Sequence, residues 1–313
     1  MNSQARSFAV DSHEPPGNPS PVLAISLVIC TRYRPAELRE CLQAVSRLTP
    51  QPDEVIIIDN TSGDAETENA AVQFKARYCV EPTPGLSRAR NRGLREAHSS
   101  IVAFIDDDAL PCGDWISRIR APFADERVAS VTGDTLPDAS LVSAVLNAPQ
   151  RTLSNANPLW FEIANFGGLG FGTNMSFRKK YCTDAEFFDP RLGRGAPIWI
   201  AEESHAFTRL LARGHLAVHV PAAVVFHPDK KRVVEKEATA SFAYWLLLLC
   251  EFPSHRRDLV RFLGRRLLRR PLTWPRDPGG PGEFINSGLG VKLRSMFAGL
   301  RLYLRARRQC TRA

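Results

Sequence analysis

The stretch Ile101–Pro111 reads IVAFIDDDALP, an apolar run that ends in three consecutive aspartates. Adjacent carboxylates repel each other, by about 1 kcal/mol at ~4 Å in water and several-fold more at a lower effective dielectric. A divalent cation removes this repulsion, and Mg²⁺ and Mn²⁺ prefer such hard oxygens. The alternatives are a solvated turn or a helix N-cap, because Asp108 and Asp114 precede an expected helix at Trp115–Phe123.

Three earlier apolar runs read as buried strands, at Leu23–Ile29, Glu54–Asp59 and, more weakly, Arg77–Glu81. Helical patterns separate them, including a polar helix from about Asp64 and a helix through Leu86 to Ala97. Strands that are apolar throughout, instead of alternating, are buried on both faces. The pattern predicts an α/β fold with a mostly parallel sheet flanked by helices.

Ligands of such sheets bind at the carboxyl ends of the strands. The first strand is followed by CTRYRP, in which Thr31 and Arg32 can contact a base or phosphate, although Pro35 is also a natural first helical residue. The second strand ends in DNTSGD, where Asp59 can bind a nucleobase or ribose and Asp64 can cap the next helix. A simple turn is the alternative for this second segment.

Positive charge accompanies these strand ends. Arg88, Arg90 and Arg92 surround the first turns of the helix that follows a proline-glycine turn. A helix N-terminus with nearby guanidinium groups favours phosphate, whereas the alternative is a solvated basic face. Because arginines two residues apart do not share a helix face, at most two of them reach one ligand.

Further carboxylates and a histidine occur downstream. Glu202 and Glu203 open an amphipathic helix, where they complement the helix dipole or supply a general base. The glycine-rich segment Phe166–Lys179 would let an acceptor approach closely. His227 follows another apolar run, and a lone histidine in such a position is more often structural than metal-binding.

The totals describe a globular protein. Its 313 residues are 44% hydrophobic, enough for a real core, and the net charge of +8 favours an anionic partner. Seven cysteines without a CxxC pair are typical of a reducing cytoplasm. No run reaches the ~18 to 20 apolar residues of a membrane span, and residues 1–22 read as a disordered lead-in. We therefore expect a cytoplasmic protein, peripheral on the inner face of the cell membrane through its basic tail.

That tail has two basic amphipathic segments. The first, RRDLVRFLGRRLLRR, places four apolar residues on one side of a helix: Leu259, Phe262, Leu263 and Leu267. A second helix is expected from about Val291 to Arg308. Such helices can lie on an anionic membrane surface, or pack on the catalytic domain and leave a wet basic face.

The order of these segments resembles the inverting family 2 glycosyltransferases, which have the GT-A fold. The likeness covers roughly Ala24–Pro228 and rests on SLVICTRYRPAELRECLQAV, PDEVIIIDNTSGD, PGLSRARNRGLREAHSSIVAFIDDD, GTNMSFRK, DPRLGRG and AEESHAFTRLLARGH. It implies a GT-A type, Rossmann-like sheet. Residues 23–135 would form the nucleotide-sugar-binding half, residues 136–229 the acceptor-binding half, and residues 230–313 a basic helical C-terminal extension.

The resemblance also implies roles for individual residues. Asp106 and Asp108 match the DXD motif, with Asp108 as the direct metal ligand, and His227 is similar in position to a late histidine that joins the metal in some GT-A enzymes. Glu203 falls where a Glu-Asp motif carries the catalytic base, with Glu202 as its neighbour. The implied nucleotide-sugar-binding residues are Thr31, Arg32, Asp59, Arg88, Asp106 and Asp107, and the implied acceptor-binding residues are Gly172, Thr173 and Asn174. Loss of Asp107 should be milder than loss of either flanking aspartate.

The implied reaction moves one sugar from a UDP, GDP or dTDP sugar to an acceptor hydroxyl with inversion, assisted by Mn²⁺ or Mg²⁺. The acceptor would be a glycan, a lipid-linked intermediate or a secondary metabolite. The chain departs from the family in reading Cys30-Thr31-Arg32-Tyr33-Arg34 for Pro-Thr-x-Asn-Arg, and Glu-Glu for Glu-Asp. It lacks the QxxRW signature of processive synthases, which indicates single-sugar transfer.

Other classes of protein are less compatible with the sequence. A nicotinamide-dependent oxidoreductase should carry GxGxxG after the first strand, and a sugar-nucleotide nucleotidyltransferase a glycine-rich phosphate loop there, whereas this chain has CTRYRP. A non-catalytic protein that binds membrane or nucleic acid through the basic tail would tolerate loss of Asp108 or Glu203. We expect no nucleic-acid partner.

Overall fold

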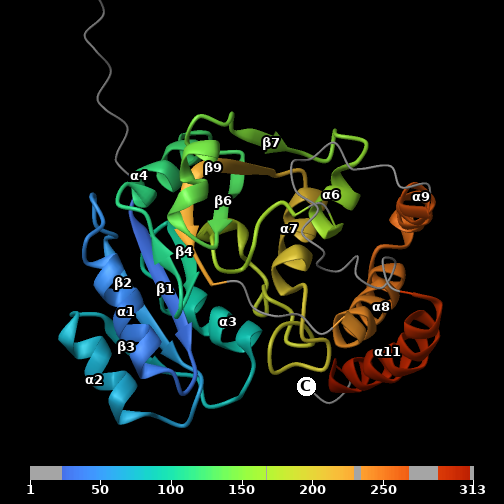
Figure 1. The fold of residues 1–313 in the computed structure, drawn as a ribbon, viewed down its shortest axis with the longest axis horizontal. Coiled ribbons are helices and arrows are strands. Elements are labelled where there is room, and N and C mark those ends of the chain that lie inside the picture. The colour runs from blue at the N-terminus through green and yellow to red at the C-terminus, as the bar shows by residue number, and fades with distance from the viewer. Residues whose placement is uncertain (1–22, 167, 229–233, 268–287, 311–313) are drawn as a thin grey trace, which may run out of the picture.

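The computed structural model describes residues 23–166, 168–228, 234–267 and 288–310 (Figure 1). The first half contains β1 (Ile25–Thr31), α1 (Pro35–Val45), β2 (Glu54–Asp59), α2 (Ala65–Gln73), β3 (Arg77–Val80), α3 (Leu86–Glu96), β4 (Ile101–Asp106), β5 (Leu110–Pro111) and α4 (Trp115–Arg120). The rest contains β6 (Val128–Leu136), α5 (Val142–Leu146), β7 (Arg151–Leu153), α6 (Trp160–Phe166), β8 (Met175–Arg178), α7 (Glu202–Ala212), β9 (Leu216–Phe226), α8 (Val234–Glu251), α9 (Arg256–Leu267) and α11 (Leu289–Cys310). The expected lead-in at 1–22 lies outside the described residues.

One mixed sheet of nine strands forms the centre of the molecule, in the order β3-β2-β1-β4-β8-β6-β9-β5 with β7 beside β9. The four strands predicted from the apolar runs pair in parallel, as expected. Beyond β4 the sheet changes direction, because β8 pairs antiparallel with both β4 and β6. The predicted α/β fold with flanking helices is confirmed, and the later strands add the antiparallel part.

The parallel strands are apolar throughout because helices cover both faces of the sheet. Along β1, Ile25, Leu27 and Ile29 pack in a core with α1, α2 and α4. Val28 points to the opposite face, where the core includes α3, α6, α7 and α8. All four side chains are fully buried, which is the physical reason for the unbroken hydrophobic run.

Predicted and observed boundaries agree closely at the strands that matter for the site. The runs 54–59 and 101–106 are strands at their predicted limits. β1 lies two residues later than predicted and therefore ends at Thr31. The helix expected at Trp115–Phe123 ends at Arg120 and continues as a 3₁₀ turn over Ala121–Ala124, which contains Pro122.

Strand register brings the expected ligand residues to one edge of the sheet. Thr31 pairs with Asp59 across β1 and β2, and Cys30 pairs with Asp106 across β1 and β4. Two predicted local features are present beside this edge. Pro35 begins α1, and the Asp64 side chain accepts a hydrogen bond from the Thr67 amide at 3.2 Å to cap α2.

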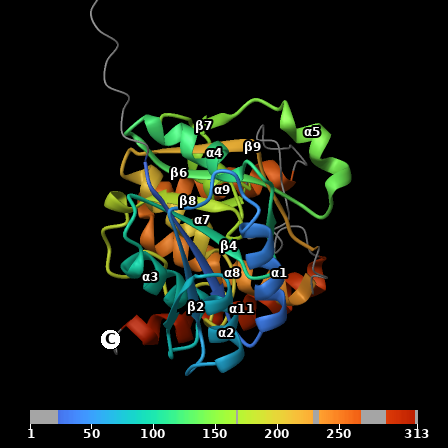
Figure 2. The same ribbon diagram turned by 90° about the vertical axis from the view of Figure 1, so that its left-hand side faces the viewer.

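The C-terminal helices pack on the face of the sheet that α3 and α7 cover. Leu259 and Phe262 of α9 are buried, and the Phe262 ring stacks on Phe166 at 4.3 Å between centroids. α11 lies along α8 at the lower side of the molecule, as Figures 1 and 2 both show. The apolar side of α9 therefore packs on the domain, whereas Leu263 and Leu267 have side chains outside the described residues. Among the described helices, none is long and apolar enough to span a bilayer.

The contact between α3 and β1 can be tested at Gly93, where an added Cβ would lie 2.4 Å from Val28 Cγ1. Because Val28 is fully buried and cannot move aside, we expect Gly93→Ala to overpack the core. Overpacking costs about 1–3 kcal/mol, and the better helix propensity of alanine returns up to about 1 kcal/mol. The free energy of unfolding, measured by urea denaturation, should fall by about 1–2 kcal/mol. Gly113→Ala is the control, since a Cβ there meets nothing within 4 Å; equal stability of the two variants would contradict this packing.

Candidate active site

Three of the predicted metal ligands converge at the carboxyl edge of the sheet. His227, directly after β9, places its Nε2 3.1 Å from Asp108 Oδ1 and 3.7 Å from Asp106 Oδ2. One ligand atom from each residue lies within 4.8 Å of the others, so the three can hold one ion. Two carboxylates and an imidazole are a donor set that suits Mn²⁺ or Mg²⁺. The lone histidine is therefore part of the aspartate cluster.

Arg34 supplies positive charge to the aspartates, a role that the sequence analysis did not give it. Its Nη1 donates to Asp107 Oδ1 at 2.6 Å and its Nη2 donates to Asp108 Oδ2 at 2.8 Å. The CTRYRP segment contains this arginine, but the sequence prediction names Thr31 and Arg32 there. Thr31 in fact donates its hydroxyl to Asp107 at 2.8 Å.

Asp107 is the middle aspartate and the most enclosed of the three. Burial raises its pKa to about 6, while the Thr31 hydroxyl and the Arg34 guanidinium act in the opposite direction. Both of its oxygens are occupied by these two side chains. Its contacts hold β1 and the segment after β4 together, so its placement indicates a positioning role more than a direct contact with the nucleotide.

Arg90 joins the aspartate cluster to α7. The guanidinium donates to Glu202 Oε1 at 2.7 Å, to the Gly172 carbonyl at 3.0 Å and to Asp106 Oδ1 at 3.5 Å. Burial opposes its charge, but the carboxylates of Glu202 and Asp106 prevail and raise its pKa. Of the three arginines expected near the phosphate, Arg90 is the one that reaches the cluster, whereas the prediction named Arg88. Arg92 pairs with Glu96 on its own helix.

The paired glutamates lie where α7 begins. Glu202 is buried against Arg90, whereas Glu203 is partly exposed. Although the residue is partly exposed, protein atoms surround its carboxyl; this desolvation, followed by the charge of Glu202, raises the pKa of Glu203 well above the ordinary glutamate range. The two neighbours therefore differ in kind: Glu202 is committed to an ion pair, and Glu203 is a carboxyl that binds a proton more readily.

A cavity of about 220 Å³ opens beside these groups. Its polar lining comes from the strand ends and from two loops, with Thr31, Arg32, Arg34, Asn60, Asp106, Asp107 and Arg194. Asn60 organises one wall, because its amide donates to the Glu81 and Thr83 carbonyls and accepts from the Gly85 amide. Gly195, at φ +84°, also lines the cavity and packs against this wall, because a Cβ on it would lie 3.2 Å from Gly85 Cα.

Asp59 is fully buried at the base of this edge. Its Oδ2 accepts from the Tyr78 hydroxyl at 2.6 Å and from the Asp64 amide at 2.9 Å. Its Oδ1 has no hydrogen-bond donor among the described residues, which leaves one acceptor for a ligand or for water. The expected contact with a base or ribose remains a prediction that this spare oxygen permits.

The residues expected to bind an acceptor have other partners. Asn174 is fully buried; its amide donates to the Asp134 and Ala223 carbonyls and accepts from the Trp115 indole. The side chain is thus occupied in joining the strands, and the expected acceptor contact of Asn174 remains a prediction. Gly172 contributes its carbonyl to Arg90, and a Cβ on it would lie 2.5 Å from Arg90 Nη2. The buried Thr173 hydroxyl faces the Asp106 amide at 3.4 Å.

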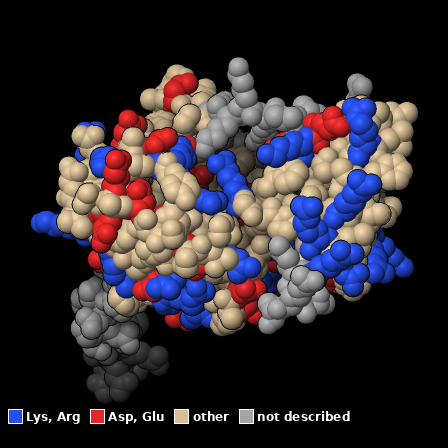
Figure 3. All heavy atoms as spheres, turned by 90° about the horizontal axis from the view of Figure 1, so that it is seen from below, with Lys and Arg blue, Asp and Glu red and all other residues tan. Residues whose placement is uncertain are grey.

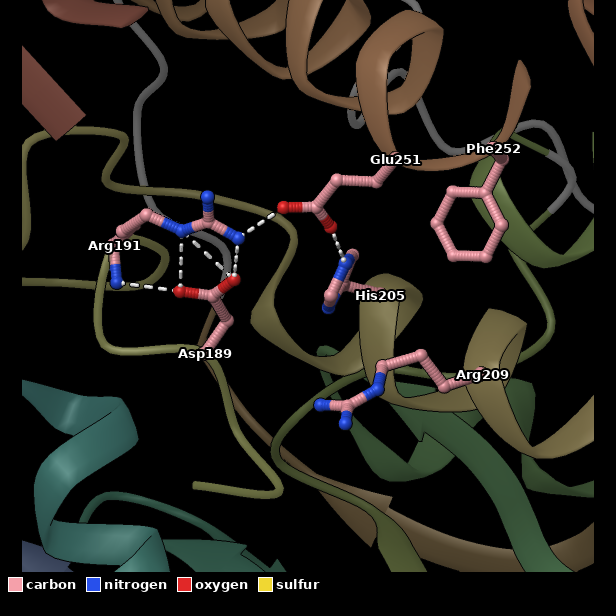
Figure 4. Close-up of a pocket in the computed structure, with 6 residues that line it drawn as sticks. All are labelled: Asp189, Arg191, His205, Arg209, Glu251 and Phe252. Atoms are coloured by element: carbon pink, nitrogen blue, oxygen red, sulfur yellow. Dashed lines mark hydrogen bonds and ion pairs between the residues drawn. The ribbon is translucent and has the colours of Figure 1, made fainter. Parts of the chain in front are cut away.

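A second charged cluster connects α7 with the end of α8 (Figure 4). His205, one turn after Glu202, places Nε2 2.9 Å from Glu251 Oε2 at the end of α8. Arg191 pairs with both Glu251 and Asp189, so one guanidinium balances the two carboxylates. These residues line a cavity of about 350 Å³ together with Arg209 and Phe252. The cluster ties the helix of the glutamates to the C-terminal extension.

Comparison with known proteins identifies the architecture. Residues 26–150 match the model of the family described as Glycosyl transferase family 2. These residues form a family 2 glycosyltransferase domain. The match includes the ends of β1, β2 and β4 and all three aspartates, and the fold is the GT-A fold that the resemblance implied.

Curated relatives match parts of the chain. The succinoglycan biosynthesis protein ExoM of Rhizobium meliloti is 32% identical over 159 residues, which are 47% of this chain and 46% of that protein. Glycosyltransferase AglE of Haloferax volcanii is 35% identical over 100 residues, 29% of this chain and 33% of that protein. The chain thus spans less than two thirds of the length of these relatives.

Solved structures resemble the chain over most of its length. The mannosyltransferase PcManGT of Pyrobaculum calidifontis, in complex with GDP-Man and Mn²⁺, has a TM-score of 0.53 at 17% identity and covers 95% of this chain and 77% of its own. S. aureus TarS residues 1–349, in complex with UDP, has a TM-score of 0.59 at 16% identity, with coverage of 91% and 81%. At these identities the likeness concerns the fold.

The Arg90–Glu202 pair is the most consequential contact for stability. Glu202→Ala leaves a buried guanidinium with the Gly172 carbonyl and, as its remaining carboxylate, the more distant Asp106, and breaking a buried pair costs about 3 kcal/mol. We expect the free energy of unfolding in urea to fall by this amount. Glu40→Ala, an exposed change on α1, should stay within about 0.5 kcal/mol. A loss for Glu202→Ala as small as that of the control would show that the pair is not structural.

Proposed function

We propose that this protein transfers one sugar from a nucleoside-diphosphate sugar to an acceptor hydroxyl, with inversion at the anomeric carbon. The observation that carries the proposal is the position of Arg90, which bridges Asp106 of the strand-end cluster and Glu202 at the start of α7. One guanidinium thus connects the cluster that can hold a divalent cation with the helix that carries the proposed general base. The family 2 domain supports the same reading.

The donor would bind in the cavity at the strand ends. Arg32 and Arg34 line it and offer positive charge to phosphates, and Thr31 also lines it. The unpaired Oδ1 of Asp59, on the neighbouring strand, would accept a hydrogen bond from the base or ribose. Asp106, Asp108 and His227 would hold a divalent cation, which when bound supplies positive charge against the departing diphosphate. PcManGT, whose structure contains GDP-Man and Mn²⁺, supports this assignment by analogy of fold.

Glu203 is the proposed general base. In its ionised form the carboxylate accepts the proton of the acceptor hydroxyl while that oxygen forms a bond to the anomeric carbon and the bond to the diphosphate oxygen breaks. The diphosphate leaves with the bonding electron pair. Because a single displacement occurs, the configuration inverts without a covalent sugar–enzyme intermediate. Glu202 acts as a positioning residue through its bond to Arg90.

We assign residues 23–135 to the donor-binding half and residues 136–229 to the acceptor-binding half, with the acceptor near the glycine-rich segment before β8. The acceptor is a hydroxyl of a glycan, a lipid-linked intermediate or a secondary metabolite. Gly172 and Thr173 remain candidates to contact it, because both lie beside Arg90 and Asp106.

A panel of UDP, GDP and dTDP sugars with Mn²⁺ tests the function directly. One donor should raise the melting temperature by roughly 5 °C at saturating concentration and be hydrolysed slowly without acceptor. Omission of Mn²⁺ should remove most of the effect. The absence of stabilisation and hydrolysis across the whole panel would overturn the proposal.

Two substitutions separate binding from chemistry. Asp108→Asn should weaken donor binding and abolish transfer, whereas Glu203→Gln should reduce kcat by about 100-fold or more with donor affinity nearly unchanged. Glu203→Asp, which keeps a carboxylate, should retain part of the activity. Isothermal calorimetry of donor binding and an initial-rate assay measure the two effects. Full activity of Glu203→Gln would exclude Glu203 as the base.

The raised pKa of Glu203 predicts the pH dependence. The base works only when ionised, so kcat/KM should rise about tenfold per pH unit and level off well above the usual glutamate pKa of about 4.3. Glu202→Gln should move this acidic limb to lower pH, because it removes the neighbouring negative charge that raises the pKa. A limb that stays in place in Glu202→Gln would show that another group controls the profile.

A further inference from the structure

α11 has two chemically different sides. One side, formed by Ser295, Gly299, Tyr303 and Ala306, is buried against α8. At Gly299 the two helices approach so closely that a Cβ would lie 2.8 Å from the Thr239 carbonyl oxygen. This side fixes the helix on the domain and determines which residues face outward.

The outward side is apolar. Six large apolar residues repeat at helical spacing along it and are exposed: Leu289, Leu293, Met296, Phe297, Leu300 and Leu304. At 100° per residue they occupy an arc of about 100°, which is a continuous stripe. Phe297 is 75% exposed. The other exposed large apolar residues of the described chain are scattered over several segments, so the outer stripe of α11 is a distinct surface.

Arginines accompany the stripe. On the same helical projection Arg294, Arg301, Arg305 and Arg308 fall along one flank of it, and α11 contains no acidic residue. Arg294 also pairs with Glu235 of α8 at 2.7 Å. Figure 3 shows the Lys and Arg side chains gathered on the right-hand part of the lower face, where α11 lies.

We propose that the outer stripe of α11 docks on the surface of an anionic lipid bilayer. An amphipathic helix with an apolar stripe and a cationic flank inserts the stripe at the headgroup boundary and places its arginines against lipid phosphates. A second copy of this chain fits less well, because pairing two such helices would bring together two sets of arginines without acidic partners on α11. The charge of the helix therefore selects the lipid surface.

This surface differs from the one that the sequence suggested first. The apolar residues Leu259 and Phe262 of α9 are buried in the domain, so α9 has no corresponding free stripe at these positions. α11 lies at the lower side in Figure 1, the side toward which β1 runs. α11 and the carboxyl edge of the sheet thus lie on the same side of the molecule, an arrangement that suits a lipid-linked acceptor, a consequence that rests on the proposed function.

Vesicle sedimentation with the full chain tests the docking independently of transferase activity. The chain should bind phosphatidylglycerol-containing phosphatidylcholine vesicles at least tenfold more tightly than pure phosphatidylcholine vesicles, and more weakly at high salt. Phe297→Ser combined with Leu300→Ser should reduce binding at least tenfold, and so should Arg301→Gln combined with Arg305→Gln. Val72→Ser on α2, a position 67% exposed and distant from α11 in Figure 1, is the matched control and should bind as the unaltered chain does.

Circular dichroism and melting temperature must be unchanged in these variants, because every altered side chain is exposed. Equal binding to both vesicle types, or undiminished binding by the Phe297→Ser/Leu300→Ser variant, would overturn the proposal. A dimer in light scattering that the same variant dissociates, without vesicle binding, would also overturn it and assign the stripe to a second copy of the chain.

Discussion

The buried guanidinium of Arg90 is the constraint on which the arrangement of the site depends. A buried cation is stable only when opposite charge and hydrogen-bond acceptors surround it. Here those partners come from three separate parts of the chain: Asp106 at the end of β4, the Gly172 carbonyl before β8, and Glu202 at the start of α7. Satisfying one side chain therefore holds the end of β4, the segment before β8 and the start of α7 together.

Positively charged side chains offset the repulsion among the three neighbouring aspartates, Asp106, Asp107 and Asp108. Arg34, Arg90 and His227 all lie within ion-pair distance of the aspartate cluster. The protein thus supplies guanidinium charge from α3 and from the turn after β1, and an imidazole from the residue after β9.

Their different electrostatic surroundings explain why the two adjacent glutamates, Glu202 and Glu203, differ. Glu202 faces Arg90 and stays an ion-pair partner, while Glu203, next to that negative charge and enclosed by protein, has a raised pKa. On the same helix, His205 contacts Glu251 of α8, which also pairs with Arg191. These contacts anchor α7 to α8. The C-terminal extension therefore supports the helix of the proposed base as well as presenting the outer stripe of α11.

The sequence by itself determined the parallel half of the fold and the identity of the strand ends. Apolar runs of six or seven residues and their caps are local properties, so β2, β4 and the start of α1 were predictable within a residue or two. Asp106 and Asp108 were predicted from their place at and just after the end of β4, and His227 from the resemblance. Only the tertiary structure could decide which arginine is buried, that Asn174 is occupied by other strands, and which apolar helix face stays outside. Those outcomes depend on contacts between residues far apart in the chain, which no local pattern encodes.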